Sequence, residues 1–220
     1  MNTVPAHAQM NFGALKGEAR ERILRVALVE FAQRGFDGVS TTEIAKAANV
    51  TQPLIHYHFK NKEALWRATA DELFVSFYRH MNDMLTFNPN ETPQVQMARM
   101  VKRYVQFAAM HPEWTRFVVR EGSKQTERLG WLVDTWIRPL LAKLADIHRT
   151  GTSQGWLRPI PLHQMLSLIM STGSLYAISP MIKMLYGVDS TGEEELSQYI
   201  DLTTRMLCNT LLVTPVQSHS

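Results

Sequence analysis

The chain has 220 residues, of which 45% are hydrophobic, 20% charged and 9% aromatic. This composition excludes a disordered or fibrous chain, and the length allows one or two domains with buried cores. The single cysteine excludes a disulfide scaffold and a cysteine-based zinc module, and it suits a reducing compartment.

The formal net charge of +3 is unevenly distributed. Residues 1–67 hold nine basic and six acidic side chains, whereas residues 68–220 hold fourteen of each. The whole positive surplus therefore lies in the N-terminal third, where it favours a polyanionic partner.

The N-terminal third has the periodicity of short helices. Residues 1–16 form a polar arm without the apolar stretch of an export signal. Apolar residues at four-residue steps, such as Ile23, Ala27 and Phe31, then predict a first helix. We expect this helix to end at Gly35, because glycine readily takes the left-handed conformation that ends helices.

Two shorter helices follow, separated by a tight turn. Ser40 or Thr41 caps the second helix, since Ser40 and Glu43 have the spacing of a capping box. Asn49 lies where the chain must reverse, and asparagine tolerates a positive φ. Thr51 caps the third helix, which has a proline in its first turn.

The rest of the chain is also predicted to be helical, and no stretch shows the alternation of a strand. Asn61 caps a fourth helix that runs from about Lys62 to Thr86. A fifth helix ends near Met110, and a sixth includes Trp114 to Val118. A seventh spans about 124–150 with a bend at Pro139, and the last two span 162–185 and 193–212.

One segment requires a comparison with a membrane span. Residues 159–182 carry no formal charge, but only 13 of these 24 residues are apolar. Since a spanning helix needs ~20 predominantly apolar residues, a helix buried between protein surfaces is favoured and no membrane partner is expected.

Two short helices joined by a tight turn are typical of a helix-turn-helix unit that binds DNA. The second of them lies in the major groove, so it needs an apolar inner face and a polar outer face. Ile55 and Phe59, four residues apart, can face inward, while Gln52 and His56 share the outer face. Glutamine can pair with both adenine N6 and N7.

Neighbouring side chains extend these candidate contacts. Pro53 and Leu54 offer apolar surface to a thymine methyl group, and Tyr57 and His58 can donate to phosphate oxygens. Lys62 adds a cation beside a helix N-terminus, which itself attracts phosphate.

The region from the first helix through Leu65 resembles the TetR family of bacterial transcriptional repressors. The resemblance is carried by the run Thr-Thr-Glu-Ile-Ala-Lys-Ala-Ala-Asn-Val-Thr at 41–51, Gln-Pro-Leu-Ile-His-Tyr-His-Phe at 52–59 and Lys-Asn-Lys-Glu-Ala-Leu at 60–65. The sequence departs from the family pattern at two positions. Many members have glycine where Asn49 stands and tyrosine where His56 stands.

The resemblance implies an all-α fold of about nine helices, with an N-terminal three-helix DNA-binding domain and a larger C-terminal ligand-binding and dimerisation domain. These domains correspond to 17–66 and 67–214, between the arm at 1–16 and a loose C-terminus at 215–220. It also implies a cytoplasmic, nucleoid-associated homodimer that represses genes from a palindromic operator on double-stranded DNA until a small-molecule effector releases it.

Family roles assign two kinds of DNA contact to this sequence. Phosphate contacts fall on Thr42, Tyr57, His58 and Lys62, base contacts on Gln52, Pro53 and His56, and Thr41 and Thr51 stand beside them as further candidates.

The C-terminal part offers candidates for an apolar or aromatic effector, although core packing is the simpler interpretation for any single residue. The candidates are Tyr104, Phe107, Trp114, Phe117, Arg120, Trp131, Trp136, Met170 and Ser174. Arg103 and Arg120 would suit an acidic ligand. Small residues on the helix 162–185 predict a homodimer through the last two helices, with packing inside one chain as the alternative.

Other functions lack support in the sequence. His56 and His58 diverge by about 200° on a helix, so we expect neither a metal nor another cofactor. An all-helical enzyme would need a nucleophile or paired carboxylates in a pocket. The sequence contains no phosphate-binding glycine loop, no metal-binding His-Glu-x-x-His motif and no nucleophile elbow. A helical adaptor that binds only protein would leave Gln52, His56 and Lys62 without a purpose.

Overall fold

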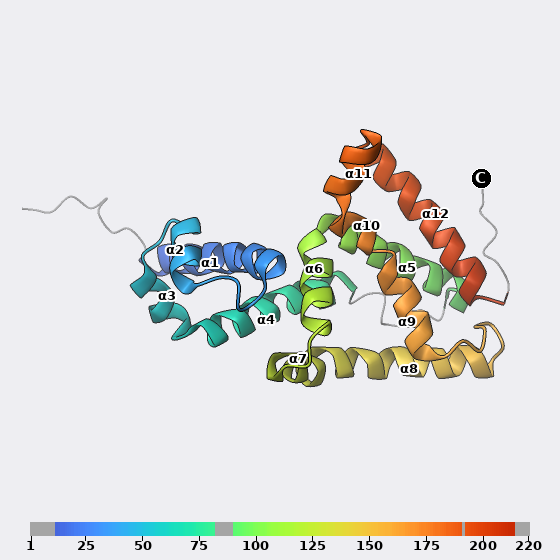
Figure 1. Ribbon diagram of the computed structural model, residues 1–220. Coiled ribbons are helices and arrows are strands. Elements are labelled where there is room, and N and C mark those ends of the chain that lie inside the picture. The colour runs from blue at the N-terminus through green and yellow to red at the C-terminus, as the bar shows by residue number, and fades with distance from the viewer. Residues whose placement is uncertain (1–11, 82–89, 191, 214–220) are drawn as a thin grey trace, which may run out of the picture. The chain divides into compact units, whose positions relative to one another are not determined.

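The computed structural model describes residues 12–81, 90–190 and 192–213, and these ranges are built from helices (Figure 1). Within them the only β-type pairing is an isolated bridge between Leu157 and Leu212. The expected all-α fold is therefore confirmed. The predicted end of the fourth helix at Thr86, the loose C-terminus at 215–220 and most of the N-terminal arm lie outside the described residues.

The helices form two compact units, which meet inside α4 (Lys62–Met81). Leu73 is the last residue of the first unit and Phe74 is the first residue of the second. The sequence places the boundary near Arg67, where polar helices give way to apolar ones. The packing places it after Leu73, because the ring of Phe74 lies 4.9 Å from that of Trp114 in the second unit.

The described residues of the first unit, 12–73, form three helices besides the start of α4: α1 (Phe12–Arg34), α2 (Thr41–Ala47) and α3 (Gln52–Phe59). The predicted apolar stripe of α1 forms the centre of this unit, since Ile23, Ala27 and Phe31 are fully buried. Burial of Ile44 on α2 and Ile55 on α3 completes a core to which each short helix contributes one apolar face.

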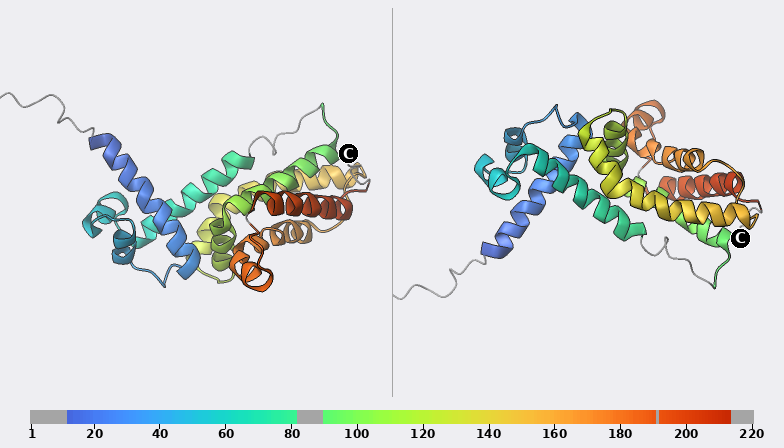
Figure 2. Two further views of the ribbon diagram at one scale, coloured as in Figure 1. Left: turned by 90° about the horizontal axis from the view of Figure 1, so that it is seen from above. Right: turned by 90° about the horizontal axis from the view of Figure 1, so that it is seen from below.

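The second unit contains the remaining helices. They are α5 (Pro93–Met110), α6 (Pro112–Gly122), α7 (Glu127–Leu132), the π-helix η2 (Val133–Ile137), α8 (Arg138–Ser153), α9 (Leu162–Ser171), α10 (Ser174–Ala177), α11 (Ser179–Tyr186) and α12 (Glu193–Leu211). Helix α12 packs mainly against α5 (Figure 2), and Lys102 forms an ion pair with Asp201 across them at 3.2 Å.

The helix predicted at 162–185 is wrong as a single element, because the structure divides this stretch into α9, α10 and α11. The first break follows α9, where the Thr172 hydroxyl donates to the Ile169 carbonyl at 2.6 Å. The second comes before Pro180, which has no N–H to continue a helix and disfavours helical backbone before it. Gly187 then ends α11 with a φ of 70°.

The same breaks divide the uncharged segment at 159–182 into shorter helices. In the described ranges no individual helix is long and apolar enough to cross a bilayer. Leu162–Tyr176 and Ser179–Tyr186 together meet the length and composition required, but they are bent by 58° at the break between them.

The predicted bend at Pro139 takes the form of a widened helical turn. Helix α7 begins at Glu127 rather than at residue 124, and η2 separates it from α8, which has Pro139 in its first turn. Because Pro139 has no N–H to donate, the hydrogen-bond ladder must change at this point. The hydroxyl of Tyr78 donates to the Trp136 carbonyl at 2.8 Å and so satisfies one carbonyl of this turn.

Candidate nucleic-acid interface and ligand cavity

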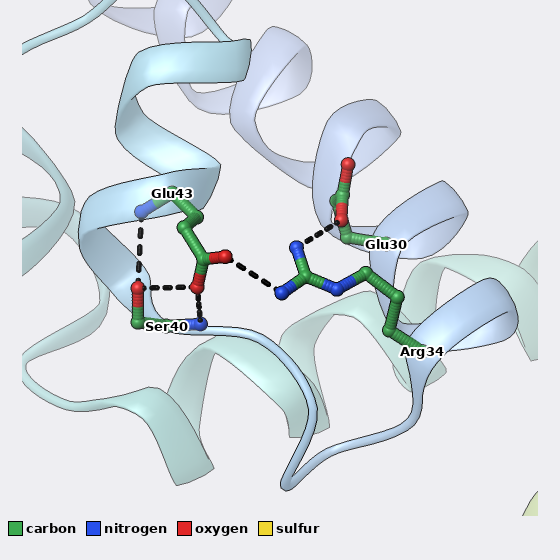
Figure 3. A network of polar contacts seen from close by, with 4 residues as sticks. All are labelled: Glu30, Arg34, Ser40 and Glu43. Carbon is green, nitrogen blue, oxygen red and sulfur yellow. Dashed lines mark hydrogen bonds and ion pairs between the residues drawn. The ribbon is translucent and has the colours of Figure 1, made fainter.

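Helix α2 is held at its first turn by the capping box that the sequence predicts (Figure 3). The backbone N–H and the hydroxyl of Ser40 donate to Oε2 of Glu43 at 2.8 and 2.7 Å. In return, the hydroxyl oxygen of Ser40 accepts the backbone N–H of Glu43 at 3.2 Å. These contacts satisfy two of the N–H groups that a helix start leaves unpaired.

A cation from α1 completes this network. Arg34 donates to Oε1 of Glu43 at 2.6 Å and to Oε2 of Glu30 at 3.2 Å (Figure 3). The hydrogen bonds from Ser40, followed by that from Arg34, lower the pKa of Glu43 to about 2. The end of α1 is thereby tied to the start of α2, a link that the spacing of nine residues does not reveal in the sequence.

The turn between α2 and α3 has the conformation predicted for Asn49, whose φ is 52°. On either side of it, Val50 donates its N–H to the Ala45 carbonyl at 2.9 Å. The Nε of Arg22 on α1 donates to the Ala48 carbonyl at 2.8 Å. Arg22 thus braces the turn from outside the two short helices, which sequence reasoning missed.

Helix α3 divides its side chains as expected. Ile55 and Phe59 are 1% and 4% exposed, while Gln52 and His56 are exposed. Tyr57 is 64% exposed. The inner and outer faces predicted for a helix that docks in the major groove are therefore present.

The other candidates lie at the edges of this face. Thr51 occupies the predicted N-cap position, but its side chain makes no capping hydrogen bond. Thr41 is half-buried and Thr42 exposed at the start of α2. Pro53 is exposed in the first turn of α3, whereas His58 is half-buried near its end, with its ring 5.1 Å from that of Tyr57.

The end of α3 contains a second positive φ that the sequence does not predict. Lys60 has φ 63° and ψ −53°, and Asn61 donates its N–H to the Phe59 carbonyl at 2.7 Å. This is a γ-turn of the strained type, centred on Lys60. Nδ1 of His56 lies 2.8 Å from the Lys60 carbonyl oxygen, so a recognition-helix side chain supports the turn.

Helix α4 starts directly after this turn. Asn61 caps it as predicted, since its Oδ1 accepts the Ala64 N–H at 2.8 Å. The Lys62 ammonium lies 4.4 Å from the centroid of the Phe36 ring, a cation–π contact that restrains the side chain. Lys62 is therefore a positioned cation beside a helix N-terminus, as a phosphate contact requires.

The second unit contains an apolar cavity of about 130 Å³. Its described walls come from α4, α5, α6, α8 and α9 and from the end of η2. The lining residues are Phe74, Phe77, Met81, Met100, Val101, Tyr104, Trp114, Val118, Ile137, Leu140, Leu141, Leu144, Met165, Leu166, Ile169 and Met170.

Three of the predicted ligand residues, Tyr104, Trp114 and Met170, line this cavity. Phe107 and Phe117 are fully buried, but they are not part of the lining. The others outside the lining are Arg103, Arg120, Trp131, Trp136 and Ser174. Sequence reasoning missed the leucines of α8, although their three- and four-residue spacing marks an apolar helix face.

Aromatic rings stack along one wall of the cavity. Phe77 stacks on Trp114 with centroids 4.4 Å apart and planes inclined by 7°. Beside them, burial raises the pKa of Tyr104 to about 12, with a smaller opposing effect of Trp114. The Tyr104 hydroxyl, which lies 3.4 Å from the Met170 carbonyl oxygen, therefore stays neutral at physiological pH.

The last two helices of the second unit expose large apolar side chains. On α11, Met184 is 88% and Tyr186 71% exposed. On α12, Leu202 and Met206 are 57% and 58% exposed. Among the small residues on the stretch 162–185, Ser167, Ser171 and Ser174 are exposed, whereas Gly173 is buried against Ala108.

Two family models match the chain. The model for bacterial regulatory proteins of the tetR family matches residues 23–69, and the model for the tetracyclin repressor-like C-terminal domain matches residues 93–207. The probable HTH-type transcriptional regulator YttP of Bacillus subtilis (strain 168) is 27% identical over 160 residues, which are 71% of this chain and 77% of that protein.

Two solved structures share the fold. AibR in complex with isovaleryl coenzyme A and operator DNA aligns with a TM-score of 0.68 at 18% identity, covering 86% of this chain and 97% of that one. The ketosteroid transcriptional regulator KstR2 of Mycobacterium tuberculosis aligns with a TM-score of 0.64 at 15% identity, covering 89% of this chain and 95% of that one.

Proposed function

Because the chain belongs to the TetR family of bacterial transcriptional regulators, we propose that it is a dimeric repressor released from a near-palindromic operator by an apolar effector. The family consists of DNA-binding regulators, not enzymes. The observation that carries the proposal is the division of α3 into a buried face with Ile55 and Phe59 and an exposed face with Gln52 and His56. Such a helix can dock on its own unit while it offers polar groups to the major groove.

In this proposal the exposed face of α3 reads bases and its surroundings hold the DNA backbone. The base contacts are Gln52, Pro53 and His56, and the backbone contacts are Thr41, Thr42, Thr51, Tyr57, His58 and Lys62. Thr41, Thr42, Thr51 and Lys62 lie before or after α3, and Tyr57 and His58 lie near its end, so these side chains surround the base-reading face.

The cavity of the second unit is the proposed effector site. Among the described residues that line it, none is charged, and Tyr104 carries its only hydroxyl group. A dry apolar cavity of about 150 Å³ can hold a benzene-sized molecule, so the volume suits a small ring or a branched acyl group. Since Arg103 and Arg120 lie outside the lining, we propose an uncharged ligand group rather than an acidic one.

The names of two structural neighbours are compatible with this ligand class. Isovaleryl coenzyme A, bound by AibR, contains a branched apolar acyl group, and KstR2 is a ketosteroid transcriptional regulator. For this chain we propose an apolar effector, and we propose neither of these two compounds as its ligand.

Helix α4 is the proposed link between effector and DNA. Phe74, Phe77 and Met81 near its end line the cavity, and Lys62 at its start is a proposed phosphate contact. A ligand can release the DNA only if it binds more tightly to a state in which the two recognition helices are wrongly spaced. Filling the cavity favours such a state by pressing on the second half of α4.

The exposed apolar residues of α11 and α12 are the proposed dimer surface. Burial of large, water-exposed apolar side chains such as Met184, Tyr186 and Met206 under a second copy of the chain would stabilise a dimer. A two-fold dimer would present its recognition helices about 34–36 Å apart, which is one turn of DNA. The operator half-sites are therefore expected to be inverted repeats.

Selection of bound fragments from genomic DNA, followed by gel-shift titration, tests the DNA proposal. Lys62→Ala should weaken binding to all duplexes about equally and reduce the slope of affinity against salt by about one, because one phosphate contact is lost. Lys143→Ala removes the same charge from an exposed site in the second unit and should change neither quantity. Equal effects of the two variants, or no binding by the wild type at low salt, would favour a protein-binding adaptor instead.

Sedimentation analysis tests the dimer surface. Met184→Glu places a charge on the exposed face of α11 and should shift the chain towards monomer at micromolar concentration. Met110→Glu is the matched control, since Met110 is 58% exposed at the end of α5. An unchanged dimer in the first variant, or dissociation in both, would contradict the proposed surface.

A further inference from the structure

The side chain of His56 has one ring nitrogen engaged before any DNA is present. Its Nδ1 lies 2.8 Å from the backbone carbonyl oxygen of Lys60. A carbonyl oxygen can only accept a hydrogen bond, so Nδ1 must carry the hydrogen. A neutral imidazole has a single N–H, and the second nitrogen, Nε2, is therefore left with a lone pair as an acceptor.

The backbone around Lys60 keeps this contact in place. The Lys60 N–H donates to the His56 carbonyl at 2.9 Å, and the Asn61 N–H donates to the Phe59 carbonyl at 2.7 Å. The Lys60 carbonyl belongs to the end of α3, where helix geometry leaves carbonyl groups without intrahelical partners. The imidazole ring supplies the missing donor, and this bond in turn limits rotation of the ring.

The position of His56 directs this acceptor to the outer face of α3. His56 is exposed, and it follows Gln52 by four residues, so the two side chains share one face. Ile55, beside it in the sequence, is 1% exposed and packs into the core. Nε2 is the ring nitrogen farther from the backbone, which places the lone pair at the tip of an outward side chain.

We infer that His56 determines base specificity by accepting a hydrogen bond from an exocyclic amine, adenine N6 or cytosine N4, once in each operator half-site. In the major groove only these two bases present an amine donor, whereas guanine presents N7 and O6 and thymine presents O4 as acceptors. His56 therefore selects adenine or cytosine against guanine and thymine at the base it meets. This inference rests on the proposed function, because it requires α3 to lie in the major groove.

The test uses the full-length protein and a duplex chosen by selection from genomic fragments. Each adenine of the duplex is replaced in turn by purine, which lacks the N6 amine, and each cytosine by pyrimidin-2-one, which lacks the N4 amine. For the wild type, one symmetry-related pair of positions should show a loss of affinity of about two- to tenfold per site, the effect of one hydrogen bond. The loss should disappear when Nε2 is removed.

The matched variant is His56→Asn. The asparagine amide lies at about the same distance from the backbone as Nδ1, so it can still donate to the Lys60 carbonyl, but it has no group in place of Nε2. This variant should retain the salt dependence of the wild type and lose its sensitivity at that one pair of positions. A comparison of the two proteins also removes any general effect of weaker base pairing in the modified duplexes.

Three outcomes separate the inference from the proposed function. Sensitivity at one pair of positions in the wild type but not in His56→Asn supports the inference. The inference is overturned if both proteins respond alike at every position, or if the position linked to His56 requires guanine N7, as shown by 7-deazaguanine. A wild type that binds no duplex would overturn the proposed function itself.

Discussion

Replacement of Lys60 by glycine should stabilise the protein, although glycine makes the unfolded chain more flexible. Lys60 has φ 63° and ψ −53°, a conformation that costs a residue with a side chain about 1–3 kcal/mol. Glycine removes this cost but adds about 0.4–1 kcal/mol of conformational entropy to the unfolded chain. The net gain in the free energy of unfolding should therefore be about 1 kcal/mol, or roughly 2–4 °C in melting temperature for a chain of this size.

Thermal unfolding followed by far-UV circular dichroism measures this gain, with Lys60→Ala as the control. Lys60 is exposed, so alanine removes the same side chain and charge while it retains the strained backbone. Lys60→Gly should melt above Lys60→Ala, and the Asn61 N–H should keep its bond to the Phe59 carbonyl. If the alanine variant is as stable as the glycine variant or more so, the γ-turn stores no strain and the reasoning fails.

Three further predictions concern the turn, the capping network and the cavity. Asn49→Val should lower the free energy of unfolding by about 1–2 kcal/mol because a β-branched residue resists the φ of 52°, while Asn49→Gly should be neutral in the same urea titration. The pKa of Glu43 is lowered from 4.5 to about 2 in the folded state. The ionised carboxylate therefore contributes fully to stability above pH ~4.5, and this contribution is lost as the pH falls from ~4.5 to ~2. An acid titration of Glu43→Gln should accordingly show a weaker dependence on pH between these values than the wild type, and identical curves would refute the network. Phe77→Ala should lower the free energy of unfolding by about 3–5 kcal/mol and enlarge the cavity, so that benzene raises its melting temperature more than that of the wild type. Equal shifts in the two proteins would place benzene elsewhere.

Features that depend on residues within four positions of one another could be predicted from the sequence. The capping box of Ser40 and Glu43, the positive φ of Asn49 and the cap at Asn61 belong to this class. The inner face of α3, with Ile55 and Phe59, does as well. In each case the short-range geometry of a helix or turn relates the residues, and their side-chain chemistry admits few alternatives.

Features that join distant segments required the folded chain. Arg22 reaches the Ala48 carbonyl and Arg34 reaches Glu43 only because α1 packs across the two short helices. Gly173, which directly follows the break at Thr172, lies so close to Ala108 of α5 that a side chain would not fit there. None of these pairs has a spacing that a sequence pattern can recognise.

The cavity and the role of His56 show the same division. Aromatic and aliphatic side chains at helical spacing are equally consistent with solid core and with a cavity wall. The difference lies in how the helices that line the described part of the cavity leave space between them. For His56, the order of residues places an imidazole on the outer face of α3. The nitrogen that remains free to meet a base is set by the Lys60 carbonyl, because hydrogen-bond geometry in the turn, and not residue identity, selects the tautomer.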